Sequence, residues 1–276
     1  MPELPEVETL KCYLEGHIIG ETIASLEARR DNLRYELSPY LEQHAVLGVV
    51  SGVKRRAKFL IMELSNGYML IFHLGMSGRL TMQSVDYQPQ KHDHIIISFQ
   101  SGDQLVFNDA RRFGMVYSCR ADMLSEQSFL NRFGQEPLEE GFDACYLLKQ
   151  LAAKKSPIKT AIMDNKIVVG VGNIYAAESL FMSKINPLTK ANTLGAGAVS
   201  ALVKSIKRVL QKAIHAGGTT LKDFLGGDSK PGYFKQELQV YGRKGLPCYI
   251  CKTPIESVKQ AGRATFFCPN CQQNKD

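Results

Sequence analysis

The sequence lacks an apolar run long enough to cross a bilayer. Its most apolar stretch, residues 59–76, is interrupted by a glutamate, an asparagine, a glycine and a histidine, whereas a membrane span needs about 18 or more consecutive apolar residues. The opening segment, MPELPEVETL, has two prolines and three glutamates instead of a basic region followed by an apolar one. We therefore expect no membrane partner and no export signal, and a cytoplasmic protein.

Internal repeats are also missing, and the charge is only mildly one-sided. Lys and Arg number 34 against 27 Asp and Glu, which gives a net charge of +7 and favours a polyanionic partner. With 276 residues, 44% of them hydrophobic, the chain can form one large core or two modest ones. Seven cysteines in a cytosolic chain suggest metal ligands or isolated thiols rather than a disulfide scaffold.

Hydrophobic periodicity divides the chain into a β-rich part and a helical part. Residues 5–17 show a helical stripe that begins with a proline. From about 22 to 118 the pattern indicates strands, with apolar runs on both sides of Asn66-Gly67 and of residues 101–103, so we expect hairpins in a sandwich or a barrel. Beyond residue 120 the pattern predicts helices over residues 122–133, 143–155, 157–165, 174–183 and 194–216.

The strongest local signal is a pair of Cys-x2-Cys motifs. Sixteen residues separate them, a spacing typical of zinc ribbons in which two knuckles supply four thiolates. The alternative, four unrelated buried cysteines, is the weaker interpretation. One zinc ion bound in this way is structural, because four thiolates leave no open position for water or substrate. The expected ligands are Cys248, Cys251, Cys268 and Cys271.

Other residues near or outside these motifs have simpler interpretations. Arg263 lies between the knuckles, where a hairpin tip can present its guanidinium to a phosphate, although a solvated surface charge has the same pattern. Cys12, Cys119 and Cys145 lie in different expected elements, and we expect them to pack as small buried groups.

The chain contains the motifs MPELPEVE, HLGMSG, KHDH, DARRFG, MDNKIVVGVGNIYAAESL, GGTTLKDF and KPGYFKQELQVYGRKGLPC. Together with the four cysteines and in this order, they resemble the formamidopyrimidine-DNA glycosylase family over nearly the whole chain. The resemblance implies an α+β fold: an N-terminal β-sandwich with a leading helix, then a helical helix-two-turns-helix domain that ends in a four-cysteine zinc-finger hairpin. The implied parts are a catalytic domain over residues 1–134, a DNA-binding domain over 135–225, and a lesion-capping loop with the zinc finger over 226–276.

The resemblance implies that Met1 is removed and that the amine of Pro2 attacks C1′ of the damaged nucleotide. A secondary amine gives an iminium directly, and an α-amino group with a pKa near 8 keeps roughly 10% free base at neutral pH, far more than an ordinary lysine. By the same resemblance Glu3 moves protons and Glu6 supports the site. The implied catalytic residues are Pro2, Glu3, Lys58 and Arg263.

Base extrusion leaves a gap in the duplex that other side chains must fill. By resemblance the inserted side chains are Met76, Arg111 and Phe113, whose types suit filling, hydrogen bonding and wedging. Met76 and Phe113 could instead be ordinary core residues. Further implied DNA contacts are His94, Arg112, Lys159 and Asn173. A glycine-rich loop is the expected lid over the extruded base, with Thr219, Thr220, Lys222, Tyr233 and Tyr241 as its expected contact residues.

The implied activity is that of a bifunctional DNA glycosylase and AP lyase of base excision repair. The expected substrate is double-stranded DNA with oxidised purines or abasic sites, chiefly 8-oxoguanine opposite cytosine and formamidopyrimidines, and the expected product is a nick made by β,δ-elimination. We expect a monomer that associates with the nucleoid. Two alternatives stay open at this point: the sister family that acts on oxidised pyrimidines, and a non-catalytic zinc-finger DNA-binding homologue.

Overall fold

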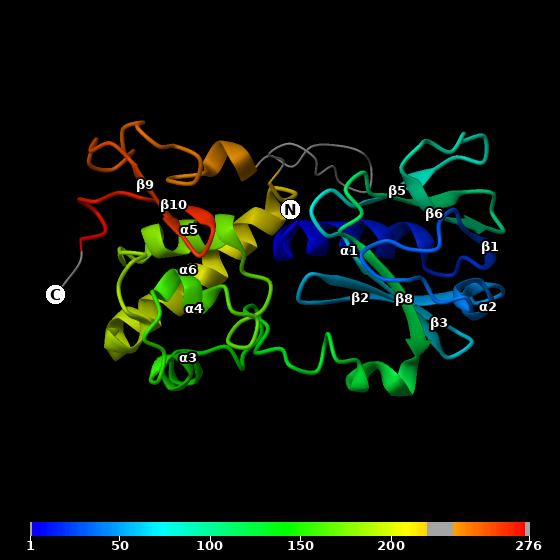
Figure 1. Ribbon diagram of the computed structural model, residues 1–276, viewed down its shortest axis with the longest axis horizontal. Helices are drawn as coiled ribbons and strands as arrows, with labels where there is room; N and C mark the ends of the chain where they lie inside the picture. The colour runs from blue at the N-terminus through cyan, green and yellow to red at the C-terminus, as the bar shows by residue number, and fades with distance from the viewer. Residues whose placement is uncertain (1, 220–233, 274–276) are drawn as a thin grey trace. The chain divides into compact units, whose positions relative to one another are not determined.

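A computed structural model describes residues 2–219 and 234–273 of the chain (Figure 1). The chain forms two compact units. The first comprises Met1–Asn131 and Ala216–Tyr233, and the second comprises Arg132–His215 and Phe234–Asp276. The first unit is therefore discontinuous in sequence. Within the described ranges, no helix is long and apolar enough to cross a membrane.

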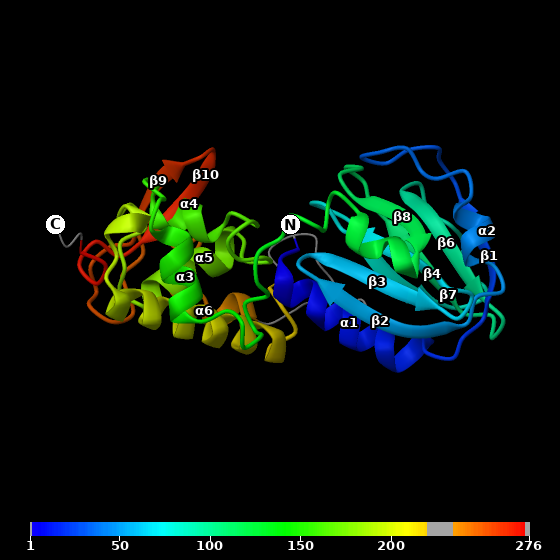
Figure 2. The ribbon, with the colours of Figure 1, turned by 90° about the horizontal axis from the view of Figure 1, so that it is seen from below.

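The first unit is a leading helix with two four-stranded antiparallel sheets. The helix α1 (Leu4–Ile18) packs on β2, beside which it lies in Figure 2. One sheet has the strand order β1-β6-β7-β5 and the other the order β2-β3-β4-β8. The strands are β1 (Ile23–Ala28), β2 (Val50–Arg56), β3 (Phe59–Leu64), β4 (Tyr68–His73), β5 (Arg79–Gln83), β6 (Asp93–Phe99), β7 (Gln104–Asn108) and β8 (Met115–Arg120), with a short helix α2 (Leu41–Ala45) after β1.

Both sheets and α1 contribute to one hydrophobic core. The helix buries Val7, Leu10, Leu14 and Ile18, which recur at the three- and four-residue spacing of one helical face. From the sheets come residues such as Phe72 on β4 and Phe107 on β7. The expected β-sandwich with a leading helix is thus confirmed. The two expected hairpins form as well, with β3 and β4 joined at Gly67 and β6 and β7 joined at Gly102, both at positive φ.

The second unit is helical and ends in a small hairpin. The helix α5 is buried along nearly its whole length, from Ile174 to Phe181, as expected for a helix inside a domain. It packs against both α6 and β10. The elements of this unit are α3 (Ala144–Leu151), α4 (Ile158–Ile162), α5 (Asn173–Met182), η2 (Ala191–Thr193), α6 (Ala196–His215), η3 (Phe234–Glu237), β9 (Glu256–Gln260) and β10 (Arg263–Phe267).

One helix predicted from the pattern was wrong. Residues 122–126 belong to a short 3-10 helix, η1 (Ala121–Glu126), and residues 127–133 form turns and irregular backbone. None of the η1 residues is buried, and Met123 is 41% exposed. A six-residue helix in which no residue is buried gains little from packing and does not continue as an α-helix.

Candidate functional site

The first turn of α1 holds two buried carboxylates. Glu3 is 2% exposed and Glu6 is 1% exposed, and Pro2 before them is buried. The backbone amide of Glu3 donates to Glu6 Oε2 at 2.8 Å, and the backbone amide of Thr219 donates to Glu6 Oε1 at 2.7 Å. Because each oxygen accepts a backbone amide, Glu6 fixes the chain next to Pro2 and connects it to residue 219.

Gly218 allows this connection. It has a φ of +82°, and a Cβ atom at this position would lie 3.1 Å from Glu6 Oε1 and 3.4 Å from Glu6 Cα. A side chain here would strain the backbone and press on the glutamate. Glycine therefore lets the following amide reach the carboxylate.

Lys58 lies in the tight turn between β2 and β3. Arg56 and Phe59 face each other across this turn. Ala57 has a φ of +55° and is buried, while Lys58 is half-buried. A left-handed backbone is uncommon for alanine, so neighbouring contacts must hold the turn.

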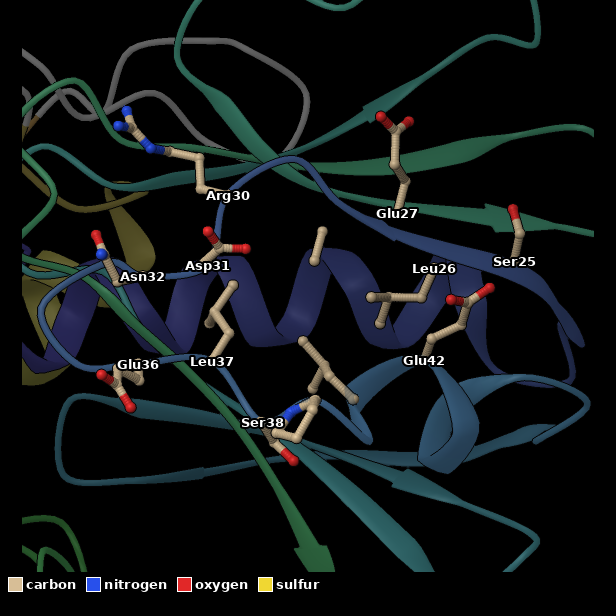
Figure 3. A pocket seen from close by; sticks show the side chains of 13 residues that line it. Ser25, Leu26, Glu27, Arg30, Asp31, Asn32, Glu36, Leu37, Ser38 and Glu42 are labelled. Atoms are coloured by element: carbon tan, nitrogen blue, oxygen red, sulfur yellow. The ribbon is translucent and has the colours of Figure 1, made fainter.

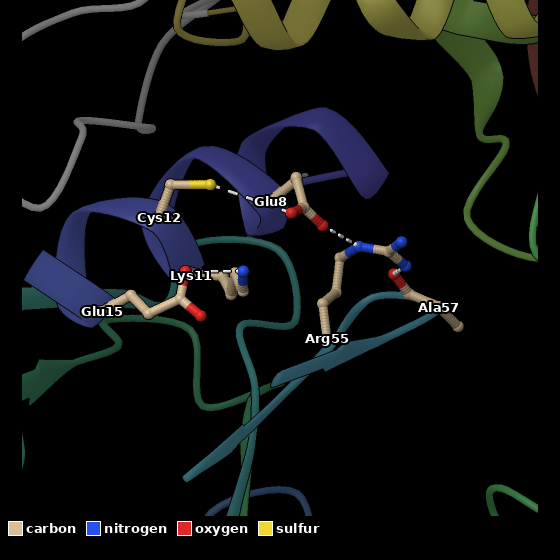
Figure 4. Close-up of polar contacts among 6 residues, drawn as sticks. All are labelled: Glu8, Lys11, Cys12, Glu15, Arg55 and Ala57. Carbon is tan, nitrogen blue, oxygen red and sulfur yellow. Dashed lines mark hydrogen bonds and ion pairs between the residues drawn. The ribbon is translucent and has the colours of Figure 1, made fainter. Parts of the chain in front are cut away.

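Arg55 supplies such contacts. Its Nε donates to Glu8 Oε2 at 2.6 Å, and its Nη1 donates to the carbonyl of Ala57 at 2.9 Å (Figure 4). The Arg55 side chain is 9% exposed, so solvent ions screen this ion pair less than a surface pair. Since Glu8 lies on α1 shortly after Glu6, the bridge fixes the turn of Lys58 relative to the helix that carries the buried carboxylates.

His73 closes β4 next to the same turn. Its ring packs on Phe59, with ring centroids 4.7 Å apart, and its Nδ1 accepts the backbone amide of Gly75 at 3.1 Å. Burial, together with the nearby charges of Lys58 and Arg34, lowers the pKa of His73 to about 4. At neutral pH this imidazole is uncharged and acts as an acceptor.

We expect His73 to make the stability of the protein depend on pH. Because its pKa is lower in the folded chain than the usual 6.5, the unfolded chain binds more protons as the pH falls. The stabilisation is complete above pH 6.5 and is lost as the pH falls toward 4, with a decrease of up to about 3 kcal/mol in the free energy of unfolding.

Urea unfolding at pH 7, 5.5 and 4.5 measures this decrease. The matched control is His73→Asn, which still accepts a hydrogen bond but does not titrate. We expect the control to lose less stability than the native sequence over this range. An identical pH dependence of the two proteins would contradict the assignment of the shift to His73.

A buried carboxylate joins two loops, residues 74–78 and 109–114. Asp109 is fully buried. Its Oδ1 accepts the hydroxyl of Ser77 at 2.6 Å, and its Oδ2 accepts the backbone amide of Gly114 at 2.7 Å. The two loops are therefore held in one arrangement by charge-assisted hydrogen bonds.

Met76, Arg111 and Phe113 protrude from these loops. Met76 is 37% exposed and Phe113 is 44% exposed, and the Arg111 guanidinium lies 5.1 Å from the centre of the Phe113 ring. Gly75 has a φ of +59°, and a Cβ atom there would overlap the backbone of Phe113. The structure thus brings the loops of these three residues together and exposes their side chains, whereas their insertion into DNA stays a prediction.

His94 and Arg112 meet at the carbonyl of Asp109. His94 is 1% exposed, and its Nε2 donates to that carbonyl at 2.8 Å, since a carbonyl only accepts. The Arg112 amide donates to the same carbonyl at 3.2 Å, while its side chain is exposed at a residue with a φ of +56°. His94 therefore supports the arginine loop from inside, and the DNA contacts expected of both residues stay predictions.

Lys159 is buried among polar groups of three elements. It is 2% exposed, and its Nζ donates to Asn173 Oδ1 at 2.6 Å, to Thr265 Oγ1 at 2.7 Å and to the carbonyl of Ala264 at 3.2 Å. Asn173 also donates to that carbonyl, at 3.0 Å. All three ammonium donors are used, so Lys159 and Asn173 join α4 and the start of α5 to β10. Their contact with a phosphate stays a prediction.

Arg263 begins β10 next to this cluster. It follows a tight turn in which Ala261 and Gly262 have positive φ, and its side chain is exposed. With Lys154 and Lys159 it lines a hollow of about 280 Å³. Asp164 also lines the hollow and pairs with Lys154 Nζ at 3.4 Å, so a phosphate contact of the exposed Arg263 guanidinium stays a prediction.

The four expected zinc ligands come together. Their Sγ atoms all lie within 4.8 Å of one another, and two of the separations are 3.9 Å (Cys248 to Cys271) and 3.4 Å (Cys251 to Cys268). A tetrahedral zinc with Zn–S bonds of about 2.3 Å requires sulfur atoms about 3.8 Å apart. The residues therefore fit one structural zinc ion.

The three cysteines outside the zinc cluster were expected to be buried, and one of them is. Cys119 is buried, whereas Cys12 and Cys145 are exposed, so the prediction of burial was wrong for these two. Cys12 lies on the outer face of α1, where its Sγ is 3.8 Å from Glu8 Oε1. That face is solvated because the apolar residues of α1 point to the core.

Two buried polar residues that the sequence analysis did not identify hold the zinc finger in place. Gln272 is fully buried. Its Oε1 accepts the Cys268 amide at 2.9 Å and its Nε2 donates to the Ile185 carbonyl at 2.8 Å, so a knuckle is joined to the loop after α5. Glu178 on α5 accepts the amides of three consecutive residues, 239–241, at 2.8–3.0 Å. Burial raises the pKa of Glu178, although these bonds oppose the shift.

Of the five residues expected in the lid, the structure describes Thr219 and Tyr241. The amide of Thr219 binds Glu6. Tyr241 packs edge-to-face on Phe266, with ring centroids 5.1 Å apart. Thr220, Lys222 and Tyr233 lie outside the described residues.

Family comparisons cover most of the chain. The formamidopyrimidine-DNA glycosylase N-terminal domain matches residues 1–116, the H2TH domain of the same glycosylase matches 133–225, and a zinc finger found in FPG and IleRS matches 245–274. The chain is 53% identical to the formamidopyrimidine-DNA glycosylase of Rickettsia conorii over 99% of both chains. It is 50% identical to that of Rickettsia felis over 100% of this chain and 99% of the other.

Solved structures agree with the sequence matches. A Lactococcus lactis FPG variant in complex with DNA containing Fapy-dG superposes with a TM-score of 0.92, at 36% identity, over 99% of this chain and 100% of that one. MutM (FPG) from Thermus thermophilus superposes with a TM-score of 0.89, at 36% identity, over 98% of each chain. These similarities confirm the resemblance and the predicted fold class, and the chain belongs to the formamidopyrimidine-DNA glycosylase family.

Proposed function

We propose that this chain is a bifunctional DNA glycosylase and AP lyase of base excision repair that acts on oxidised purines in double-stranded DNA. The observation that carries the proposal is the first turn of α1. There Pro2 directly precedes two buried carboxylates, and Glu6 anchors the backbone through the amides of Glu3 and Thr219. A terminal amine held beside a carboxylate can act as a nucleophile with a proton acceptor at hand.

The chemistry starts from the free amine of Pro2, after removal of Met1. The nitrogen lone pair forms a bond to C1′, the glycosidic bond breaks, and the departing base takes the bonding electrons and a proton. The C1′–O4′ bond then breaks, O4′ takes up a proton and the amine loses its own, which leaves an iminium on the opened sugar. Removal of a C2′ proton expels the 3′ phosphate, removal of a C4′ proton expels the 5′ phosphate in a second elimination, and water releases the sugar fragment from Pro2.

The other predicted residues have roles that suit their surroundings. In this proposal Glu3 moves protons during ring opening, and Lys58 and Arg263 bind the phosphates that leave in the two eliminations. The exposed side chains of Met76, Arg111 and Phe113 fill the gap after base extrusion. The structural zinc holds the hairpin that carries Arg263.

The remaining assignments belong to the same proposal. His94, Arg112, Lys159 and Asn173 contribute to DNA binding, and Thr219, Thr220, Lys222, Tyr233 and Tyr241 belong to a lid over the extruded base. Catalysis is assigned to residues 1–134, DNA binding to 135–225, and lesion capping with the zinc finger to 226–276. We further propose that the protein acts as a monomer in the cytoplasm, at the nucleoid.

The named complexes of relatives support this substrate class. The Lactococcus lactis enzyme has been solved with DNA that contains Fapy-dG and with DNA that contains an abasic site, and a MutM has been solved with carbocyclic 8-oxo-G. A second candidate is activity on oxidised pyrimidines, because the Lactococcus lactis enzyme has also been solved with such DNA.

Borohydride trapping on matched duplexes tests the proposal. We expect a covalent adduct and a nick with 8-oxoguanine opposite cytosine, and rates at least about tenfold lower with an oxidised pyrimidine in the same sequence. Equal or reversed rates would favour the pyrimidine activity. Tight DNA binding with no adduct from amino-terminally processed protein would favour a non-catalytic homologue and overturn the proposal.

A further inference from the structure

The first zinc knuckle, residues 248–251, carries two exposed apolar side chains. Cys248 is buried, whereas Tyr249 is 56% exposed and Ile250 is 66% exposed. The amide of Lys252 donates to the carbonyl of Cys248 at 3.0 Å, which closes a tight turn. Because the cysteines at both ends of this turn face the metal site, the two residues between them stay on the surface.

A hollow of about 270 Å³ lies beside this knuckle. Phe181 in its wall belongs to the same hydrophobic cluster as Cys248, so α5 and the zinc finger hold the hollow in one shape. The ring of Phe234 is likewise fixed, with its centroid 5.9 Å from that of Tyr175. The apolar part of the lining consists of three buried side chains and two exposed ones, which are Phe181, Val209 and Phe234, and Met182 and Ile250, respectively.

The size of the hollow suits one large apolar side chain of a partner. Sites for drug-sized molecules usually measure about 300–1,000 Å³, which is more than the space available here. Single exposed apolar residues are common on any surface, whereas several of them around a hollow are typical of a protein–protein contact. Leu246, shortly before the knuckle, is exposed as well.

The charges at the hollow are partly compensated. Lys184, Lys212, Glu178 and Glu237 line it. Glu178 is buried, and its two oxygens accept the amides of residues 239–241. The other three side chains are exposed, and none of them has an ion pair among the described residues. Two lysines and one glutamate therefore face solvent at the hollow.

The segment around the knuckle makes this surface more basic. Residues 243–252 include Arg243, Lys244 and Lys252 and no acidic residue. The Arg243 guanidinium lies 3.5 Å from the centre of the Tyr249 ring, and its Nη2 donates to the carbonyl of Pro247 at 2.9 Å. Neither contact neutralises its charge. Five basic side chains thus surround the apolar residues, against one exposed acidic side chain.

A larger hollow elsewhere in the chain has the opposite charge. It measures about 610 Å³ and lies between β1, the loop that follows it and α2 (Figure 3). One guanidinium, from Arg30, faces four carboxylates there, from Glu27, Asp31, Glu36 and Glu42. An acidic ligand is repelled from this hollow, so it serves as an internal contrast to the basic surface at the knuckle.

The knuckle lies away from the proposed DNA contact of the zinc finger. Arg263 follows the turn at the tip of the β9–β10 hairpin, whereas Cys268 directly follows the other end of β10. Five strand residues with a rise of about 3.3 Å each separate the two ends by about 15 Å. A ligand at the knuckle therefore leaves the hairpin tip free.

We propose that Met182, Leu246, Tyr249 and Ile250 with the hollow beside them, here called the knuckle surface, bind an acidic segment of a partner protein. One bulky apolar side chain of that segment fills the hollow as an anchor, and the basic side chains select its acidic neighbours. Duplex DNA does not fit, because its phosphates have nothing to place in an apolar hollow. A second copy of the same surface does not fit either, since it brings like charges together.

The binding test uses the full zinc-loaded protein with a duplex that carries a stable abasic-site analogue already bound, so that the DNA-binding surface is occupied. The probe is a labelled, end-blocked octapeptide of aspartate and glutamate with one central phenylalanine, measured by fluorescence polarisation. We expect saturable binding with a Kd below about 1 mM. Peptides with serine in place of phenylalanine, or with amides in place of the carboxylates, should bind at least about tenfold more weakly, because they lose the anchor or the charge complementarity.

Two variants locate the site. Ile250→Ser removes an apolar wall of the hollow, and Lys212→Glu reverses a charge beside it. Each should weaken peptide binding at least about fivefold while zinc content and duplex affinity stay unchanged. Lys204→Glu is the matched control, because it makes the same charge change at an exposed position of α6 that does not line the hollow. Glu42→Gln, in the acidic hollow, should likewise have no effect.

Photo-crosslinking identifies the contact directly. A peptide with benzoylphenylalanine in place of phenylalanine should label Met182 or Ile250 on irradiation, as located by mass spectrometry. Several results would overturn the proposal: no peptide binding by the native sequence, equal binding of the serine peptide, displacement of the peptide by excess duplex, labelling only elsewhere, or a dimer that Ile250→Ser converts to a monomer. If Ile250→Ser lost zinc and failed as a probe, Lys212→Glu and the crosslink would decide.

Discussion

Protein that retains Met1 is expected to form no borohydride-trapped adduct and to release no damaged base, whereas processed protein does both. With Met1 in place the Pro2 nitrogen is an amide, whose lone pair is delocalised and does not attack C1′. Glu6 holds the backbone beside Pro2 in one position. The amine of Met1 therefore does not move into the position of the Pro2 nitrogen and replace it as nucleophile. Trapping yield should fall to background.

Intact mass identifies the two forms, and trapping on a duplex with 8-oxoguanine compares them. Binding to a duplex with a stable abasic-site analogue serves as the control, and the two forms should bind it with affinities within a few-fold of each other. Pro2→Gly, after processing, keeps a primary amine and should give a reduced adduct. An adduct of normal yield from protein whose mass includes Met1 would disprove the role of the Pro2 amine.

Loss of zinc should abolish DNA binding and cleavage. The four cysteines match a tetrahedral site, and a structural zinc of this kind contributes about 10–16 kcal/mol of binding free energy to folding. Cys268→Ser should therefore unfold the zinc finger and free the hairpin that carries Arg263. We expect the DNA affinity to decrease at least about a hundredfold.

Metal analysis, limited proteolysis and DNA titration over a range of salt concentrations measure this effect. Cys145→Ser is the matched control, because Cys145 is an exposed thiol outside the cluster, and it should retain zinc and full affinity. A zinc-free Cys268→Ser protein that bound duplex DNA as tightly as the control would exclude a structural role of the metal in DNA binding.

Regular patterns in the sequence predicted most of the elements. The stripe over residues 5–17 corresponds to α1, and the alternating runs around Gly67 and Gly102 correspond to hairpins. The cysteine spacing likewise predicted a cluster that the structure contains. In each case the information lies within a short stretch of sequence, because apolar residues or cysteines recur there at the spacing of the element or motif. The prediction of a helix over residues 122–133 was wrong because no residue of η1 is buried, although Phe129, which stacks on Phe59, and the buried Leu130 pack after it.

The supporting residues of the candidate site could not be predicted in this way. Glu178 binds amides up to 63 residues away, and Gln272 binds a carbonyl 87 residues away. Asp109 similarly joins loops that are 32 residues apart. No periodicity connects such partners, so only the folded chain shows which polar residues are buried together. The family resemblance indicated Pro2 and Lys58, whereas the bridge from Glu8 through Arg55 to Ala57 became visible only in the structure.

The hydrogen bond between Glu6 and the amide of Thr219 spans 213 residues. The surroundings of Pro2 therefore depend on a residue that is synthesised much later than Pro2 itself. A ribosome that has made the whole sandwich, through Asn131, has not yet made the amide that completes the surroundings of Pro2, because the helical unit is encoded between them. The surroundings of Pro2, the proposed nucleophile, are thus complete only after the segment that follows α6 has emerged. The two units are consequently poor candidates for exchange as separate modules, since a fragment that ends at Asn131 leaves one oxygen of a buried carboxylate without this partner.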